Sequence, residues 1–489
     1  MPTISCVSHE FLQRTFQYLD PDSYSVHKGD LYNCLQVCRL WHSVALPIVY
    51  HRFHIRVNCP AFPNDPFVRQ LASPHLSHIK ILSISMSSQG QLYISQGECL
   101  ETILHLTRLI NLVSSIQVLR RVDFDLFVFT TSFCEDGLWQ SLQPANEAVL
   151  RLARELVLRN PDLYLRLGRP ELMEERSIEI ASRPVMDAIL QETKSTITSL
   201  FTGCHLPWLL SHLEQILQLS ELFYVNVTSP YENQAAHESR LWNIIASMAL
   251  EKLMLDSVDL FYVERLPTGL VELVLTHLDD TVSVTNAVLK QLPNLRLLSL
   301  RLQKPRETES SDARCLESEI VCRGLRKVWW TKSAAPEGVM SLVAKSCQHL
   351  ESLSLPRTAT DRDIVEAVLL ARYLREIWMM DCPAITENAF GALKNLRNLK
   401  YVQLDVQLSH FLSETIVFEL TTFCTSLREI RLVFNDSGKE DSRRDQVLEK
   451  IQGGENYKTE INHVMSFQAS NLGDKMRLDM SELRRRLVK

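Results

Sequence analysis

Residues 350–379, LESLSLPRTATDRDIVEAVLLARYLREIWM, contain two copies of one short pattern separated by an apolar-periodic segment. Each copy reads Leu-x-x-apolar-x-apolar, and the two copies start at Leu350 and Leu374. Alternate residues of an extended strand point to the same face, so this pattern predicts a short strand with one buried face. Thr360 and Asp361, residue types that begin helices, precede the apolar-periodic segment. The stretch therefore predicts a unit of strand, turn and covering helix.

The same pattern recurs through the second half of the chain, at intervals of 20 to 30 residues. This interval is close to the 20–29 residue period of leucine-rich repeats. Such repeats stack into a solenoid, in which each strand lies beside the next and the helices cover the core from outside. We therefore expect an α/β leucine-rich-repeat solenoid with parallel strands on its concave face and helices on its convex face. The repeats start at Leu250, Leu270, Leu295, Leu325, Leu350, Leu374, Leu399 and Leu427.

Other parts of the chain follow the pattern less closely. Strand-like apolar triplets occur in residues 79–84, 119–124 and 219–224, separated by helical patterns. Residues 125–200 show no clear strand repeat, so a separate domain there is an alternative. We expect a helical domain over 1–55, irregular repeats over 56–245, regular repeats over 246–435, and a capping element or flexible tail over 436–489. The charged stretch 304–319 is expected to be an exposed insertion.

The N-terminal stretch 7–50 contains two apolar-periodic segments around Asp20-Pro21-Asp22, where proline ends the first helix. Leu19-Asp20-Pro21 and Val37-Cys38-Arg39-Leu40-Trp41 resemble the turn and the last helix of an F-box, although Val7-Ser8 replaces the usual Leu-Pro start. Residues 379–393, MMDCPAITENAFGAL, resemble the cysteine-containing leucine-rich repeat often found behind F-boxes, with Cys382, Ile385 and Phe390 buried. The chain is thus similar to F-box proteins with leucine-rich repeats.

This resemblance implies a partner for the N-terminal helices. Similar proteins bind the Skp-family adaptor of a Skp–cullin–F-box ubiquitin ligase, and through it a cullin, and they hold a target protein on the repeats. Catalysis then belongs to other subunits, and the chain itself is not an enzyme. The residues expected to contact the adaptor or support that contact are Phe11, Leu12, Phe16, Leu19, Leu31, Leu35, Val37 and Trp41.

Composition is that of an ordinary globular protein: 45% of the 489 residues are hydrophobic, 22% are charged and the net charge is −6. This balance does not call for a nucleic-acid partner. No apolar run approaches the roughly 18 residues of a membrane span, and residues 1–13 lack the features of a signal peptide. The twelve cysteines form no CxxC pair and resemble reduced core residues. We expect an intracellular protein of the cytoplasm or nucleus.

Catalytic motifs are absent from the sequence: it has no GxSxG, GxxxxGK[ST] or HExxH pattern. We therefore expect no cofactor, although an enzyme whose active site assembles within 55–245 remains an alternative. Cys34, Cys38 and His42 follow each other at helical spacing, and they could bind zinc. Core packing explains both cysteines more simply, so no metal is expected.

Residues that alternate with the buried leucines should form columns on the concave face. Trp329 and Trp378 lie in one column, two repeats apart, with Ser354 between them. At the usual strand spacing they would stand roughly 10 Å apart as the walls of a notch, whereas Trp330 should be buried. Tryptophans often carry binding energy at interfaces. Residues expected to bind a target are Trp329, Trp378, Lys327, Glu376, Tyr401 and Arg431.

Two functions remain open at this stage. The first is a substrate-recognition subunit of a Skp–cullin–F-box ubiquitin ligase, which binds the adaptor through its N-terminal helices and a protein target through its repeats. The second is a leucine-rich-repeat interaction scaffold outside any ubiquitin ligase. Binding of the adaptor separates them.

Overall fold

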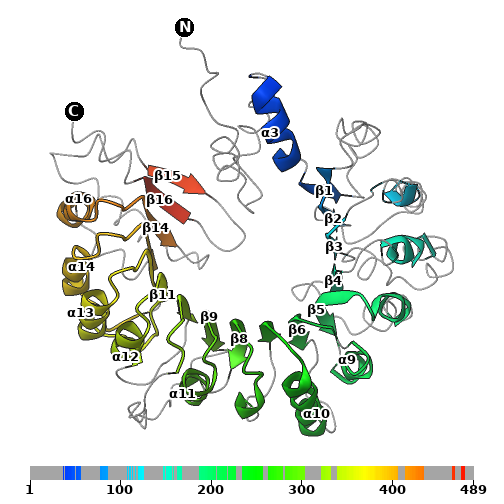
Figure 1. Ribbon diagram of the computed structural model, residues 1–489. Coiled ribbons are helices and arrows are strands. Elements are labelled where there is room, and N and C mark those ends of the chain that lie inside the picture. The colour runs from blue at the N-terminus through cyan, green and yellow to red at the C-terminus, as the bar shows by residue number, and fades with distance from the viewer. Residues whose placement is uncertain are drawn as a thin grey trace. The chain divides into compact units, whose positions relative to one another are not determined.

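The structure of the protein is a computed structural model in which the chain forms two compact units, 1–237 and 238–489. Each unit is a layer of parallel strands with helices on one side (Figure 1). The structure describes residues 37, 39–49, 51–56, 78–85, 107–120 with gaps, 121–125, 147–158 with gaps, 162–167, 187–204, 206–216, 218–226, 234–256, 263–278, 281–302, 321–331, 339–380, 382–405, 414–433, 465–468 and 475–479.

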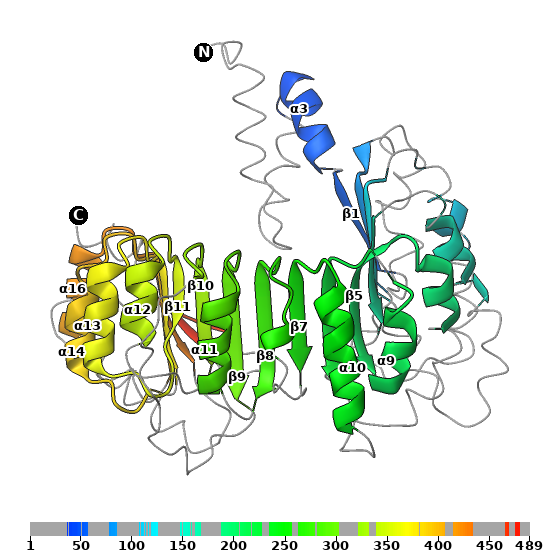
Figure 2. The same cartoon turned by 60° about the horizontal axis from the view of Figure 1, so that its bottom comes forward.

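The eight strands from β7 to β14 of the second unit follow each other in sequence order and run in the same direction (Figure 2). Every strand falls where the repeated leucine pattern predicts one, which confirms the solenoid of regular repeats. The strands are β7 (Lys252–Asp256), β8 (Glu272–Leu278), β9 (Leu297–Leu302), β10 (Lys327–Thr331), β11 (Ser352–Ser354), β12 (Glu376–Met379), β13 (Tyr401–Asp405) and β14 (Glu429–Val433).

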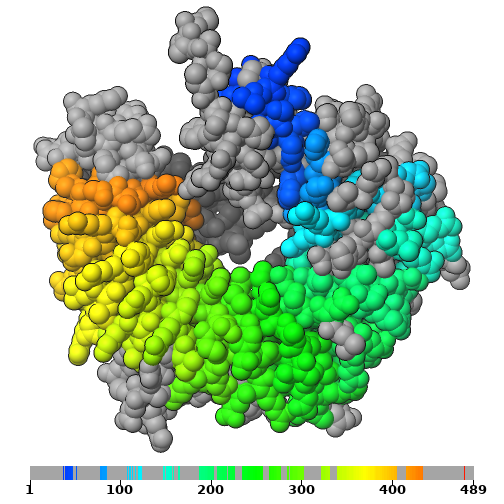
Figure 3. All heavy atoms as spheres, in the orientation of Figure 1, coloured from blue at the N-terminus to red at the C-terminus, as the bar shows by residue number. Residues whose placement is uncertain are grey.

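The leucine that opens each repeat is buried, with at most 1% of its surface exposed. It turns the chain into the strand, and from the repeat at Leu270 onward its backbone N–H donates to the carbonyl three residues earlier, as between Leu350 and Cys347 at 3.0 Å. The repeats adjoin as successive layers (Figure 3). Stacking therefore buries a continuous row of leucines, which is the source of stability in a solenoid.

Helices cover the outer side of this sheet (Figures 1 and 2). Thr360 begins α13 with a reciprocal capping box to Asp363, and Thr386 begins α14, as predicted from the sequence. Cys382, Ile385 and Phe390 are buried, which confirms the expected core of that repeat. The helices are α10 (Gln234–Ser247), the 3-10 helix η5 (Val263–Arg265), α11 (Thr281–Gln291), α12 (Val339–Ser346), α13 (Asp361–Leu370), α14 (Glu387–Leu393) and α16 (Glu414–Phe423).

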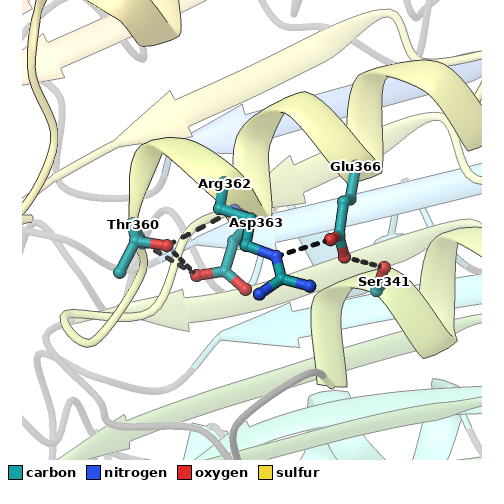
Figure 4. Close-up of polar contacts among 5 residues, drawn as sticks. All are labelled: Ser341, Thr360, Arg362, Asp363 and Glu366. Atoms are coloured by element: carbon teal, nitrogen blue, oxygen red, sulfur yellow. Dashed lines mark hydrogen bonds and ion pairs between the residues drawn. The ribbon is translucent and has the colours of Figure 1, made fainter.

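Polar contacts also join neighbouring helices on the outer side (Figure 4). Ser341 of α12 donates a hydrogen bond of 2.5 Å to Glu366 of α13, and Arg362 donates to the same carboxylate at 2.9 Å. The hydrogen bond from Ser341, followed by that from Arg362, lowers the pKa of Glu366. Glu366 thus ties one repeat to the next.

Two C-terminal strands continue the sheet in the opposite direction. β16 (Lys475–Asp479) pairs antiparallel with β14, and β15 (Met465–Gln468) pairs antiparallel with β16. This pair covers the last edge of the parallel sheet. The expected insertion 304–319 lies outside the described residues.

The first unit contains six parallel strands, β1 to β6, again in sequence order. The predicted triplets correspond to β2, β3 and β6. Strand β4 lies in 125–200 and strand β5 begins there, and because they pair with β3 and β6 they belong to the same sheet rather than to a separate domain. The elements are α3 (Arg39–Val49), β1 (Arg52–Arg56), β2 (Ile81–Ser85), β3 (Arg121–Asp125), β4 (Asp162–Leu167), β5 (Ile197–Cys204), α9 (Leu206–Leu213) and β6 (Glu221–Asn226).

Sequence reasoning missed β4 and β5 for identifiable reasons. The strand β5 is eight residues long and carries the polar residues Ser199 and Thr202 at buried positions. The pairing of β4 with β5 also shifts register between Leu163 and Tyr164. These irregularities hide the leucine pattern. Among the helices that the structure describes, none has the length and apolar character needed to cross a membrane.

Candidate functional site

The inner face of the second unit presents two tryptophans side by side. Trp329 of β10 and Trp378 of β12 are half-buried, and their rings stack at 5.6 Å between centroids with an angle of 20°. Trp330, which points the other way, is completely buried and donates to Thr285 at 3.3 Å. The alternation predicted from the sequence is therefore confirmed. The expected notch of roughly 10 Å is not present, because the two indoles lean together and close it.

Small residues of the intervening strand allow this stacking. Ser354 is the register partner of both tryptophans, and it is buried beneath them with 1% exposure. The indole N–H of Trp329 donates to Ser352 at 3.0 Å, and the ammonium of Lys327 lies 5.9 Å from the centre of the Trp329 ring. We call these five residues the tryptophan platform. It offers a flat aromatic surface with a cation at one end, and such stacked pairs are energetically favourable.

A second group lies on β13 and β14 of the same face. Arg431 binds Glu429 with two hydrogen bonds, of 2.7 and 3.1 Å, and its guanidinium lies 5.5 Å from the centre of the Tyr401 ring. The hydrogen bond that Arg431 donates to Glu429 is the largest cause that raises the pKa of Arg431, and the charge of Glu376 contributes. The fork of Arg431 is therefore already engaged. It is thus not a free bidentate donor for a ligand.

The structure thus divides the six residues predicted to bind a target into two groups. Lys327, Trp329 and Trp378 come together in the platform, and Tyr401 and Arg431 come together around Glu429. Glu376 is the register partner of Ser352 on one side and Tyr401 on the other, so it lies between the groups. Sequence reasoning missed Ser352 and Glu429 as site residues. Both hold the same repeat position as Lys327, Glu376 and Tyr401, and this shared position was the signal that could have found them.

The inner face of the first unit carries aromatic contacts of its own, none of which we predicted. Phe201 of β5 and Phe223 of β6 stack at 5.9 Å, and Arg121 lies 5.1 Å from the centre of the Tyr164 ring. Arg121 also forms an ion pair of 2.6 Å with Asp123. Both units therefore expose aromatic and charged side chains between their buried residues.

One polar cluster in the first unit contains an aspartate bound to a histidine, an arrangement also found in catalytic sites. Asp187 accepts hydrogen bonds from the Trp208 indole at 2.6 Å and from the His212 ring at 2.8 Å. The neighbouring hydroxyl of Ser211 donates instead to the Trp208 carbonyl at 2.7 Å. Asp187 therefore links the helix 187–193 to α9. Hydrolases that use a histidine as base require a nucleophile hydrogen-bonded to that histidine, and none is found among the described residues.

Metal ligands do not gather in the described part of the chain, where no three His, Cys, Asp or Glu side chains are grouped. Of the zinc alternative, Cys34 and Cys38 lie outside the described residues, and His42 is exposed on α3.

The N-terminal helices are described only in part. Val37, in a turn before α3, is 47% exposed and Leu40 of α3 is 36% exposed, whereas Val44 and Ala45 of α3 are buried and Trp41 is half-buried. One side of α3 is thus covered and another side leaves apolar residues at the surface. Six predicted adaptor contacts lie outside the described residues: Phe11, Leu12, Phe16, Leu19, Leu31 and Leu35.

Comparison with known families gives the N-terminal stretch its assignment. Residues 9–56 match the model of the F-box-like family. The N-terminal part of this chain is an F-box-like domain. The F-box-like domain ends with α3 and β1, so the first strand of the repeat sheet lies within the matched region. The chain therefore joins an F-box-like domain to leucine-rich repeats, as the resemblance in the sequence implied.

Solved structures with similar folds are distant from this chain. The yeast complex of Rad7 and Elc1 contains a chain with 14% identity and a TM-score of 0.38, covering 87% of both chains. The leucine-rich repeat-containing protein LegL7 from Legionella pneumophila has 11% identity and a TM-score of 0.24, covering 83% of this chain and 98% of LegL7. A chain in the TLR13–ssRNA13 complex has 12% identity and a TM-score of 0.26, covering 76% of this chain and 57% of that one. No curated protein matches the chain.

Proposed function

We propose that this protein is the substrate-recognition subunit of a Skp–cullin–F-box ubiquitin ligase. The F-box-like domain binds a Skp-family adaptor, which connects the chain to a cullin, and the inner face of the repeats binds a protein target. The observation that carries this proposal is the match of residues 9–56 to the F-box-like family in a chain that continues as leucine-rich repeats. This role belongs in the cytoplasm or nucleus, where such ligases work.

The contribution of the chain to ubiquitin transfer is proximity. A target held on the repeats shares one complex with the ubiquitin-conjugating enzyme, which raises its effective concentration without new chemistry on this chain. A non-catalytic receptor needs binding surfaces rather than a nucleophile. The tryptophan platform meets this need, because tryptophans near the centre of a surface are the residues that most often dominate binding energy.

The exposed apolar residues in α3 and just before it provide a place to test adaptor binding. Val37 and Leu40 are exposed, so aspartate at these positions costs little folding energy, but it would place two charges in the expected interface. We expect the purified chain to bind the purified adaptor in calorimetry with micromolar or tighter affinity. The Val37→Asp, Leu40→Asp variant should lose that binding, by about a hundredfold or more.

Leu158→Asp is the matched control, because Leu158 is 78% exposed in the first unit and outside the F-box-like domain. This control should bind as the wild type does, and thermal unfolding should show that all variants remain folded. A Leu12→Asp, Phe16→Asp variant tests the first predicted helix in the same assay. If the folded wild-type chain does not bind the adaptor, the proposal is wrong, and the chain is a leucine-rich-repeat scaffold outside any ligase.

A further inference from the structure

Six turns of the second unit lie along one edge of its sheet, where the parallel strands begin. Each turn leads from a covering segment into a strand, and its last residue donates a backbone hydrogen bond of 2.7 or 2.8 Å to the corresponding residue of the preceding turn. Arg428 bonds to Lys400 in this way, and Lys400 bonds to Arg375. The turns are therefore stacked in order. They are residues 292–296, 322–326, 347–351, 371–375, 396–400 and 424–428.

These turns concentrate positive charge. They hold eight arginine or lysine residues and one acid, Glu351, so their formal charge is 8 − 1 = +7. The whole chain has a formal charge of −6, which leaves −6 − 7 = −13 for all other residues. Positive charge is thus gathered at one edge of an otherwise acidic protein. We call these residues the basic edge: Arg296, Arg323, Arg326, Arg372, Arg375, Arg397, Lys400 and Arg428.

Among the described residues, most of this charge has no acidic partner. Glu351 lies between Arg326, at 3.7 Å, and Arg375, at 3.3 Å, and both arginines remain about half exposed. Arg323 has a further interaction and is left out of this comparison. In the part of the chain that the structure describes, no carboxylate pairs with the five remaining members of the basic edge. These members are Arg296, Arg372, Arg397, Lys400 and Arg428.

An exposed aromatic residue lies within the edge. Tyr373 is 55% exposed, follows Arg372 in its turn, and lies with its ring 5.9 Å from that of His349 in the preceding turn. The edge therefore offers one apolar contact among many cations. Single-stranded nucleic acids are bound on surfaces where aromatic side chains recur for successive bases. The six turns contain one tyrosine and no tryptophan or phenylalanine, which does not fit that mode of binding.

We propose that the basic edge docks an acidic segment, rich in aspartate and glutamate, of a partner protein. Seven of the eight cations are arginines, whose forked donors match the two oxygens of a carboxylate. Complementary charge at an exposed rim accelerates encounter and selects partners. The basic edge is separate from the F-box-like domain, so the proposal does not depend on adaptor binding.

Fluorescence anisotropy of the full chain, without adaptor, tests this proposal. The probe is a labelled peptide in which glutamate and glycine alternate, compared with the same peptide carrying glutamine in place of glutamate. We expect the acidic peptide to bind at least about tenfold more tightly, with an affinity that falls as salt is added. The Arg372→Glu, Arg397→Glu variant should weaken this binding about tenfold, because both side chains are exposed and neither pairs with an acid among the described residues.

Arg151→Glu, Lys194→Glu is the matched control, since it makes the same change in net charge at two exposed residues of the first unit. It should bind the peptide as the wild type does. Lys400→Glu, Arg428→Glu is a second edge variant that should behave like the first, should the first fail to fold. The proposal is overturned if the two peptides bind equally, or if the edge variants and the control lose binding equally. A single-stranded oligonucleotide of equal charge is added as a competitor. If it displaces the peptide, binds more tightly than the peptide and loses its binding in the edge variants, the proposal is overturned in favour of nucleic acid.

Discussion

At the residue scale, Ser354 determines what the inner face of the repeats can offer. A larger side chain at this position would stand between Trp329 and Trp378 and hold their rings apart. Because Ser354 is small and buried, the two indoles meet above it and exclude water from one face of each ring. The platform is thus ordered before any partner arrives. Preordered aromatic side chains lose little conformational entropy on binding.

The stacking predicts an energetic coupling between the two tryptophans. We expect Trp329→Ala and Trp378→Ala each to lower the free energy of unfolding, and the double variant to lose less than the sum of the two. The coupling should be about 0.5 to 1.5 kcal/mol, the usual range for aromatic pairs. Urea unfolding of the four proteins measures it. Met254→Ala combined with Trp378→Ala is the control cycle, because Met254 lies on β7, away from the platform, so its losses should be additive. Additive losses for the Trp329→Ala and Trp378→Ala pair would contradict the prediction.

At the element scale, buried cysteines join three of the turns that lead into strands to the repeat before them. The thiol of Cys322 donates to the Leu292 carbonyl at 3.0 Å, and that of Cys347 donates to the Cys322 carbonyl at 3.2 Å. Cys424 makes the equivalent contact with the Leu393 carbonyl at 3.2 Å. A cysteine at this position is small enough to be buried, and its thiol adds a second donor to a carbonyl that already accepts the backbone N–H three residues later. These thiols therefore help to set the spacing between repeats.

Burial gives two of these thiols a measurable pH dependence. Desolvation raises the pKa of Cys322 and of Cys347 from 9.0 to about 12. Between these values the unfolded chain loses the thiol protons that the folded chain keeps, so the folded state binds more protons and stability falls as pH rises. We expect the urea midpoint of the wild type to decrease through this window. The Cys322→Ser, Cys347→Ser variant should show a shallower decrease, because serine does not titrate there.

A slope equal to that of the wild type would show that the two thiols do not govern alkaline unfolding. The same burial should make both thiols slow to react with iodoacetamide while the protein is folded. Once the protein is unfolded in urea, both thiols should react with iodoacetamide at the rate of an ordinary cysteine.

At the scale of the whole molecule, a repeat sheet must protect its ends. The last parallel strand, β14, would expose an unpaired edge if β16 did not cover it with five register pairs. Leu478 of β16 is fully buried, so the capping strand also contributes to the core. Terminal elements of this kind keep repeat proteins soluble.

Removing residues 465–489 should therefore expose the edge of β14. We expect this truncated chain to unfold at lower urea concentration and to associate in light scattering, because free strand edges pair with other chains. Removing only residues 480–489 is the matched control, since both capping strands remain. If the longer truncation stayed monomeric and as stable as the control, β15 and β16 would not act as a cap.

Much of the second unit could be predicted from the sequence, and the rest failed for physical reasons. The strands, the buried Trp330 and the capping residues Thr360 and Thr386 follow from patterns within a few residues, so they were predicted correctly. The width of the space between Trp329 and Trp378 was predicted wrongly. Strand spacing fixes the distance between backbones, but rotation of the side chains brought the rings to 5.6 Å.

By itself, the sequence determined where strands, turns and helices lie in the regular repeats, because alternating burial and capping are local properties of the chain. It also determined the resemblance of the N-terminal stretch to an F-box. Only the tertiary structure decided that β4 and β5 belong to the sheet, that the two indoles stack, and that six separate turns form one basic edge. These features depend on which residues become neighbours across 20 to 30 intervening positions, and stacking of the repeats sets those neighbours.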